Sequence, residues 1–243
     1  MAVTVCDDTA VAARAVADRI GAALQRKRSL VLGLPAGRTP QPVYGELKRR
    51  HAAAEIDFGQ VTTFNLDEFV GIAATHPGSF RRAMQEQFFD AVNVTPERIG
   101  FLDGMAADLE GECRRYERQI AAVGGIDLQL LGIGTNGHIG FNEPGDQLIA
   151  ATHRAELLPA TREANAPLFG GDASLVPSSA LTIGIGTILS AREVILIAFG
   201  ERKARCIEQM VRGAVTTHLP ASFLQLHPRA ELLLDRGAAS RLT

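Results

Sequence analysis

The sequence predicts an α/β protein, with a mostly parallel open sheet that carries helices on both faces in a modified Rossmann-like arrangement. Short apolar runs of strand length alternate along the chain with longer stretches of helical period. One such run, 126–133, is apolar at most positions, as expected for a strand covered on both faces. No linker, repeat or low-complexity tract divides the 243 residues. We therefore expect a single domain over residues 1–243.

The first half of the chain contains three of these alternations. Strands are expected at 3–6, 29–34 and 61–66. Asp8 or Thr9 can cap the first helix, which has an apolar stripe of Ala12, Val16, Ile20 and Leu24. The second helix is expected to begin near Pro40, since proline suits a first helical turn. The third helix should carry Phe80, Met84, Phe88 and Ala91.

The second half is less regular. A short strand is expected at 99–102, and a helix striped by Leu109, Cys113, Tyr116 and Ile120 follows it. Residues 145–177 lack a clear period, and so long a connection is usually functional or mobile. We interpret this stretch as a lid, with a plain surface excursion as the alternative. Strands at 180–184, 193–200 and 230–234, a helix beginning at Lys203 and another at 221–226 complete the chain.

Composition excludes several classes of protein. The net charge of −2 argues against a nucleic-acid partner, which would require a basic face. The three cysteines are far apart and lack a C-x-x-C spacing, which indicates free thiols in a reducing compartment. We see no signal peptide and no uncharged apolar run of membrane length. The expectation is a cytoplasmic protein with no membrane partner.

The strand at 126–133 leads into a loop that combines glycines with an imidazole, amides and a carboxyl group. Gly132, Gly134 and Gly137 match the G-x-G-x-x-G dinucleotide pattern. That pattern requires a helix to open at the third glycine, but residues 138–144 have no helical period. A nicotinamide or flavin site is therefore disfavoured, and no cofactor is expected. The glycines are better explained by tight turns and close approach of a ligand.

Two other segments can bind an anion. Gly37, Arg38 and Thr39 lie between a strand and a helix, where backbone N–H groups can cradle a phosphate. An ordinary strand-to-helix turn is an equal alternative. Lys203 opens a later helix after Gly200 and is either a second phosphate-binding cation or a solvated surface lysine.

Acid–base groups follow two of the strands. Asp67 and Glu68 are adjacent in extended chain, so at most one of them faces a ligand; a partly desolvated carboxyl group there can act as a base, although a cap or turn role is the alternative. His138 has Asn136 and Glu143 in its own loop, and a carboxylate near an imidazole fixes its tautomer. Together these groups suggest acid–base chemistry on a phosphorylated small molecule. We find no convincing Ser or Cys nucleophile and no set of metal ligands.

The segments that carry these groups resemble one family. Residues 32–40 (LGLPAGRTP), 64–71 (FNLDEFVG) and 132–144 (GIGTNGHIGFNEP) are similar to glucosamine-6-phosphate deaminases, of the glucosamine/galactosamine-6-phosphate isomerase and 6-phosphogluconolactonase superfamily. The resemblance continues through 161–165, 180–184, 200–204 and 224–228, so it spans nearly the whole chain. It implies amino-sugar catabolism, in which glucosamine 6-phosphate and water become fructose 6-phosphate and ammonia without a redox cofactor.

The resemblance also implies roles for single residues. Asp67 would move a proton from C2 to C1 of the open-chain sugar, and His138 would exchange a proton with the ring oxygen. Asn136 and Glu143 would support ring opening. The sugar phosphate would be held by Gly37, Thr39 and Lys203.

Three departures from the family pattern concern this site. Asn136 stands where some members have Asp, and an amide can orient His138 but not stabilise an imidazolium as a charge. Pro167 stands where the family typically has a phosphate-binding Arg, and Arg38 where a second glycine is common. We hypothesise that Arg38 supplies the missing cation. Segments 145–147 and 153–155 also lack the effector-binding residues of allosteric relatives, so no such activation is expected.

Other functions remain open on the sequence. A 6-phosphogluconolactonase-type hydrolase is one, although its histidine loop typically lacks the Phe-Asn-Glu-Pro run at 141–144. A deaminase or isomerase of another amino-sugar phosphate, such as galactosamine 6-phosphate, is a second, and a non-catalytic sugar-phosphate sensor is a third. All of them bind a small phosphosugar. The sequence is compatible with a homo-oligomer but does not determine the oligomeric state.

Overall fold

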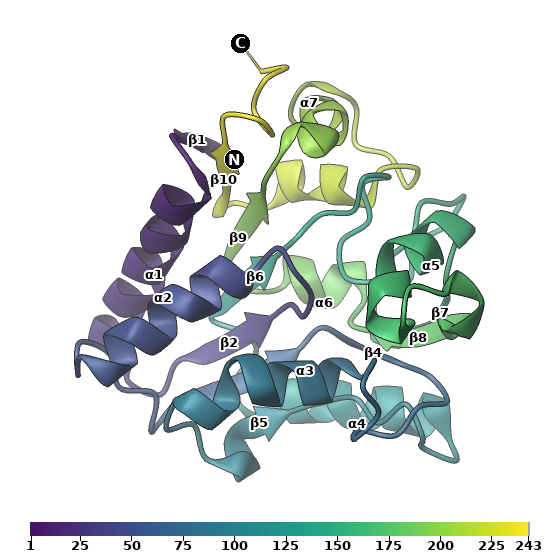
Figure 1. Cartoon of the computed structure of the whole chain (residues 1–243), viewed down its shortest axis with the longest axis horizontal. Helices are drawn as coiled ribbons and strands as arrows, with labels where there is room; N and C mark the ends of the chain where they lie inside the picture. Colours follow the sequence, from purple (N-terminus) through teal and green to yellow (C-terminus); the bar gives the residue numbers. More distant parts are fainter. Residues whose placement is uncertain (243) are drawn as a thin grey trace.

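The computed structural model describes residues 1–242, and its centre is a seven-stranded sheet in the order β1-β10-β9-β6-β2-β3-β5 (Figure 1). Every pair of neighbours in this sheet is parallel. The strands are β1 (Ala2–Cys6), β2 (Val31–Leu34), β3 (Thr62–Asn65), β5 (Ile99–Gly100), β6 (Leu128–Leu131), β9 (Glu193–Ala198) and β10 (Ala230–Asp235).

Helices cover both faces of this sheet, which confirms the predicted fold class. One buried cluster joins the sheet to α1 (Thr9–Arg26), α2 (Gln41–Ala52) and α3 (Phe80–Gln87). The other joins it to α4 (Leu109–Ala122), α6 (Ile185–Leu189), α7 (Ala204–Arg212) and the 3₁₀ helix η6 (Pro220–Leu226). The short 3₁₀ helices η2 (Pro96–Arg98) and η5 (Glu201–Lys203) precede β5 and α7. No helix of residues 1–242 is both long and apolar enough to cross a membrane.

The first two helices begin where the sequence predicts, the third is shorter than predicted, and α6 was not predicted. The Asp8 carboxylate caps α1 by accepting a hydrogen bond from the Val11 N–H at 2.8 Å. The helix α2 begins directly after Pro40. The third helix ends at Gln87 instead of running to residue 91, because the backbone breaks at Phe88 (φ −138°) and continues as the 3₁₀ helix η1 (Phe89–Ala91). This break lets the consecutive rings of Phe88 and Phe89 both enter the core.

A second, antiparallel sheet was not predicted. It has the order β4-β8-β7, with β4 (Asp67–Phe69), β8 (Ser179–Thr182) and β7 (His153–Glu156). The strand expected at 180–184 therefore pairs outside the parallel sheet, in contrast to the prediction. Asp67 likewise begins a new strand. Hydrophobic alternation identifies a strand but not the partner with which it pairs, so the sequence could not separate the two sheets.

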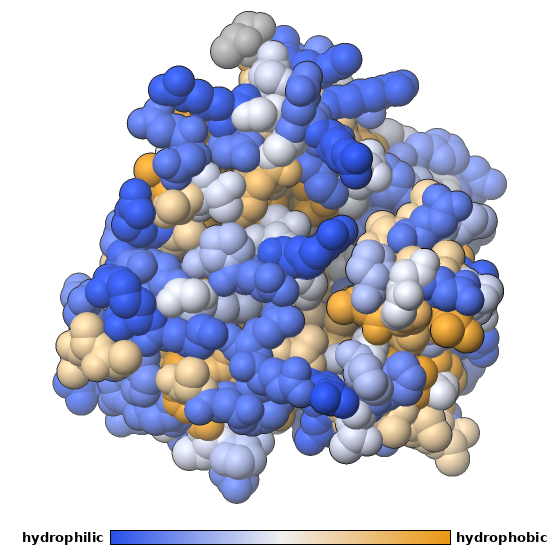
Figure 2. Space-filling model, in the orientation of Figure 1, coloured by the Kyte–Doolittle hydropathy of each residue, from blue (hydrophilic) through white to orange (hydrophobic). Residues whose placement is uncertain are grey.

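Residues 145–177, predicted as irregular, contain several short elements. These are β7, α5 (Pro159–Asn165) and the 3₁₀ helices η3 (Ala166–Phe169) and η4 (Ala173–Leu175). They form the lobe that carries α5 in Figure 1, and Phe169 packs against Phe69 of β4 with ring centroids 5.4 Å apart. Apolar surface gathers over this lobe in Figure 2, and Leu158 and Leu175 are exposed. Elements of three to seven residues are too short to show a period.

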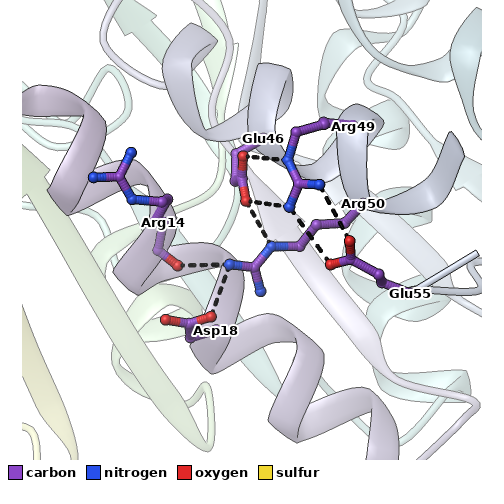
Figure 3. A network of polar contacts seen from close by, with 6 residues as sticks. All are labelled: Arg14, Asp18, Glu46, Arg49, Arg50 and Glu55. Carbon is purple, nitrogen blue, oxygen red and sulfur yellow. Dashed lines mark hydrogen bonds and ion pairs between the residues drawn. The ribbon is translucent and has the colours of Figure 1, made fainter. Parts of the chain in front are cut away.

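A polar network holds α2 against α1 (Figure 3). The Arg50 guanidinium contacts the carboxylates of Asp18 at 2.7 Å and Glu46 at 2.8 Å, and it also donates to the Arg14 carbonyl. Hydrogen bonds from Arg49 and then Arg50 lower the pKa of Glu46 to about 2. Because α2 begins at the end of the 35–40 loop, this network also fixes where that loop meets the helix.

At the opposite edge of the sheet, Asp127 holds three segments together. Its buried carboxylate accepts hydrogen bonds from Lys27 Nζ at 2.6 Å and the Val31 N–H at 2.8 Å, and it pairs with Arg192 at 3.1 Å. We expect Asp127→Ala to lower the free energy of unfolding by about 1–3 kcal/mol, because it leaves a buried N–H without a partner. Urea unfolding monitored by circular dichroism measures this difference.

The control is Asp7→Ala, which removes an exposed ion pair with Arg236. Exposed pairs contribute little, so this variant should unfold within about 0.5 kcal/mol of the wild type. Equal effects of the two substitutions would contradict the prediction.

Candidate active site

Four strands that are neighbours in the sheet each deliver one part of the candidate site. They are β9, β6, β2 and β3, in that order. The segments that follow them contain Lys203, the 132–145 loop, residues 37–39 and Asp67, respectively. Because the strands are parallel, their carboxyl ends lie at one edge of the sheet. The topology therefore gathers all the predicted site residues at the same edge.

The adjacent carboxyl groups of Asp67 and Glu68 have different environments. Glu68 is buried and accepts hydrogen bonds from the Phe80 and Arg81 N–H groups and from Ser79 Oγ, at 2.7–3.1 Å. It therefore satisfies the free N–H groups at the start of α3. Asp67 is 8% exposed, and its carboxyl group makes no hydrogen bond with any residue of 1–242. Only Asp67 is free to act on a ligand.

Burial sets the acid–base character of Asp67. Loss of solvent, assisted by the nearby charge of Glu68, raises the pKa of Asp67 to about 8. A carboxyl group with a pKa in this range is a much stronger base, once deprotonated, than an ordinary aspartate. Such a group suits proton abstraction near neutral pH.

The predicted association of His138, Glu143 and Asn136 is present in the structure. Glu143 Oε2 lies 3.5 Å from His138 Nδ1 and accepts a hydrogen bond from Asn136 Nδ2 at 2.9 Å. The 3.5 Å separation is an ion-pair distance and is longer than a normal hydrogen bond. Burial raises the pKa of Glu143, but the interactions with His138, Thr161 and Asn136 outweigh it and leave that pKa below its usual value. Glu143 is therefore an anion facing one ring nitrogen, which leaves Nε2 for a ligand.

The glycines of this loop pack against the imidazole. No helix begins at Gly137, and the next helix along the chain is α5. A Cβ atom at Gly134 would lie 2.3–2.6 Å from the His138 ring, so that position must remain glycine. The Gly134 N–H also donates to the His138 carbonyl at 2.9 Å. We call residues 132–145 the histidine loop. The match to a dinucleotide pattern thus reflects the close packing of this loop against His138.

The predicted anion-binding groups lie beside the start of that loop. Lys203 Nζ donates to the Ile133 carbonyl at 2.5 Å, and Thr39 lies next to Gly132. Gly37 has a φ of +99° and faces open space. Burial lowers the pKa of Lys203, and the charge of Arg38 lowers it further. Two cations close enough to repel each other are stabilised when an anion binds between them.

Position 167, where the sequence resemblance implies a phosphate-binding arginine, is occupied by a proline. Pro167 is exposed within η3. The Arg162 guanidinium donates instead to the carbonyls of Ala173, Ser174 and Val176. No group of three or more His, Cys, Asp or Glu side chains arranged for a metal ion occurs among residues 1–242.

Sequence reasoning missed two residues that support the site. Asn142 is buried and donates to the carbonyls of Ile139 and Ile183 at 2.9 Å. Thr182 accepts a hydrogen bond from the Phe141 N–H at 3.0 Å. Asn142 and Thr182 lie in segments 132–144 and 180–184, which carry the sequence resemblance described above. Their roles depend on the antiparallel sheet, so no pattern along the chain could have revealed them.

The fold and the site define an α/β protein with acid–base groups and an anion-binding loop at the carboxyl edge of a parallel sheet. Comparison with known proteins then places the chain. Residues 7–233 match the model of the family described as glucosamine-6-phosphate isomerases/6-phosphogluconolactonase. The chain belongs to this family.

Individual relatives lie close to the chain. Glucosamine-6-phosphate deaminase 1 of Giardia intestinalis is 47% identical, over 97% of this chain and 88% of the relative. The glucosamine-6-phosphate deaminase of Arthrobacter sp. (strain FB24) is 49% identical, over 93% and 86%. Among solved structures, a monomeric glucosamine-6-phosphate deaminase has a TM-score of 0.96 at 40% identity, over 99% of this chain and 100% of that one. A 6-phosphogluconolactonase from Trypanosoma cruzi shares the fold, with a TM-score of 0.79 at 20% identity over 100% of this chain and 97% of that one.

The environment of Asp67 is predicted to lower the stability of the folded protein near neutral pH. Its pKa is higher in the folded state than in the unfolded chain, so the folded state holds its proton more tightly, and stability falls as pH rises from about 4 to 8. Asp67→Asn removes this cost. We expect the variant to be more stable than the wild type at pH 7 by about 2–4 kcal/mol.

Denaturant unfolding at several pH values measures the difference between Asp67→Asn and the wild type. This difference in the free energy of unfolding should increase between about pH 5 and pH 8. Glu68→Gln is the matched control: it weakens the cap of α3 and should lower stability. A loss of stability in Asp67→Asn at pH 7 would refute the expectation.

Proposed function

We propose that the chain is a glucosamine-6-phosphate deaminase, which converts glucosamine 6-phosphate and water to fructose 6-phosphate and ammonia. The observation that carries the proposal is the gathering of two proton-transfer groups beside an anion-binding loop. Asp67 is a buried carboxyl group without a hydrogen-bond partner among residues 1–242. His138 faces the Glu143 carboxylate, Lys203 donates to the Ile133 carbonyl of the same loop, and the charge of Arg38 acts on Lys203.

Ring opening is the first step that these groups support. His138 exchanges a proton with the ring oxygen of the sugar, and an imidazole suits this transfer near neutral pH. The Glu143 anion, 3.5 Å from Nδ1, stabilises the ring while it carries the proton. Asn136 orients Glu143, and its side-chain oxygen also accepts a hydrogen bond from the backbone N–H of His138 at 3.2 Å.

Isomerisation then depends on Asp67. Its carboxylate removes the C2 proton to form an enolamine and returns the proton to C1, which leaves an imine at C2. Water adds to this imine, and ammonia leaves as the C2 ketone forms. C1 is reduced while C2 is oxidised within the same sugar, and water replaces ammonia at C2, so the chemistry requires no external redox cofactor. The high pKa of Asp67 strengthens it as a base for a weakly acidic C–H bond.

We further propose that Gly37, Arg38, Thr39 and Lys203 bind the phosphate group. The open space at Gly37 admits it, and the two cations neutralise it. In this proposal residues 145–177 act as a lid, because Leu158 of this lobe donates its N–H to Glu143 at 3.3 Å. The cytoplasmic location remains a prediction.

The alternatives differ in what they require of Asp67. Lactone hydrolysis activates water for attack at C1 and removes no proton from C2, so it does not require a strong base aimed at C2. The Phe-Asn-Glu-Pro run at 141–144, whose Glu143 contacts His138, also favours the deaminase. Deamination of galactosamine 6-phosphate would use the same groups and differs only at C4.

The decisive experiment incubates the purified protein with glucosamine 6-phosphate and measures ammonia and fructose 6-phosphate. We expect both products in equal amounts. Galactosamine 6-phosphate and 6-phosphogluconolactone are run in parallel. Hydrolysis of the lactone without release of ammonia would overturn the proposal.

The pH dependence of this reaction tests the role of Asp67. The base must be ionised, so kcat/KM should fall as pH drops below the pKa of about 8, approaching tenfold per pH unit. Asp67→Asn should lower kcat by at least about 100-fold at every pH. Steady-state rates between about pH 6 and pH 9 measure both effects. A flat profile in the wild type would exclude Asp67 as the base.

Arg38 is tested through substrate binding. We expect Arg38→Ala to raise KM for glucosamine 6-phosphate by about 10- to 100-fold while kcat changes little, because a charge-assisted contact to phosphate is lost. The control is Arg26→Ala, at the end of α1 on the opposite edge of the sheet. An unchanged KM in Arg38→Ala would mean that Lys203 and the loop are sufficient.

A further inference from the structure

Thr182 lies between the two halves of the proposed catalytic machinery. It is fully buried at the end of β8, where it pairs with Asp67 of β4. Side chains of directly paired residues on neighbouring strands lie on the same face of a sheet, about 5 Å apart at their Cβ atoms. The Thr182 side chain and the Asp67 carboxyl group therefore share one face of the small sheet.

The same hydroxyl group holds the histidine loop. Thr182 Oγ1 accepts a hydrogen bond from the Phe141 N–H at 3.0 Å. A Cβ atom at Gly140 would lie 2.8 Å from this oxygen and 3.8 Å from Asp67 Oδ2, so the loop backbone passes close to both. One threonine thus contacts the loop that carries His138 and Glu143, and pairs with the strand that carries Asp67.

Ile183, which follows Thr182, connects the same two segments through its backbone N–H and carbonyl groups. The Ile183 carbonyl accepts a hydrogen bond from Asn142 Nδ2 at 2.9 Å. The Ile183 N–H donates to the Leu66 carbonyl at 2.8 Å. The end of β8 is therefore bonded to the histidine loop on one side and to the segment preceding Asp67 on the other.

We propose that Thr182 is a positioning residue that sets the separation between Asp67 and the His138–Glu143 pair. This inference rests on the proposed function. Within residues 1–242, Asp67 forms no hydrogen bond or ion pair with His138 or Glu143, so their spacing depends on intervening groups. One substrate must reach both, and a displacement of about 1 Å can cost about 100-fold in rate. A β-branched side chain suits this task because its χ1 angle is restricted.

The test compares variants that keep or remove the hydroxyl group. Thr182→Val preserves the shape but removes the acceptor, and Thr182→Ala is a second variant without the hydroxyl. Both should lower kcat by about 10- to 100-fold while KM for glucosamine 6-phosphate changes less than about threefold. Thr182→Ser keeps the hydroxyl and should stay within about threefold of the wild-type kcat.

The matched control is Thr63→Val in β3. Thr63 is also fully buried, and its hydroxyl group has no hydrogen-bond partner among the described residues. We expect its kcat and KM to match those of the wild type. Equal losses of kcat in Thr63→Val and Thr182→Val would reduce Thr182 to a general packing role and overturn the proposal.

A double-variant cycle distinguishes positioning from structural support. If Thr182 acts through the histidine loop, adding Thr182→Val to Glu143→Gln should cost far less than it costs in the wild type, since that loop is already impaired. Independent, multiplicative losses would contradict the proposal.

A last measurement does not depend on activity. Amide hydrogen exchange of residues 139–143 should become at least about tenfold faster in Thr182→Val, because the Phe141 N–H loses its acceptor. Thr63→Val should leave it unchanged. Unchanged exchange in Thr182→Val overturns the positioning role, whereas a wild-type protein that releases no ammonia contradicts the proposed function instead.

Discussion

The structure depends on keeping one carboxyl group, that of Asp67, away from water and from hydrogen-bond donors. Burial without a partner raises its pKa to about 8 and destabilises the folded protein near neutral pH. The neighbouring Glu68 has the opposite environment, with several donors at the start of α3. Two adjacent acidic residues thus differ in role because a strand directs their side chains to opposite faces.

The small antiparallel sheet explains how this environment is maintained. Without β4, Asp67 would lie at the end of a parallel strand, where loops are open to solvent. In the structure it is paired with Thr182, and the rings of Phe69, Phe80, Phe141 and Phe169 pack together close by. The same aromatic cluster joins β4, α3, the histidine loop and the lobe. Exclusion of water from Asp67 and attachment of the lobe therefore rely on one set of contacts.

The candidate anion-binding residues are not positioned by the small antiparallel sheet, because they follow β2 and β9 of the parallel sheet. Arg38 and Lys203 are separated by 165 positions in the sequence, yet each influences the site through its charge. Lys203 is also tied to the Ile133 carbonyl, at the start of the histidine loop. The proposed phosphate-binding lysine and the histidine loop are thus in direct contact. Pro167 is exposed and carries no charge, so position 167 supplies no cation, which is consistent with the hypothesis for Arg38.

The sequence by itself determined the α/β class, the helix starts at Asp8 and Pro40, and the identity of the candidate site residues. These follow from local causes: strand-length apolar runs, caps, and motifs in which the chemistry lies within a few residues. Only the tertiary structure decided that the strand at 179–182 leaves the parallel sheet, that Asp67 lacks a hydrogen-bond partner while Glu68 has several, and that Thr182 joins the two halves of the site. Pairing partners and burial depend on contacts between residues far apart in the chain. No pattern along the sequence encodes them directly.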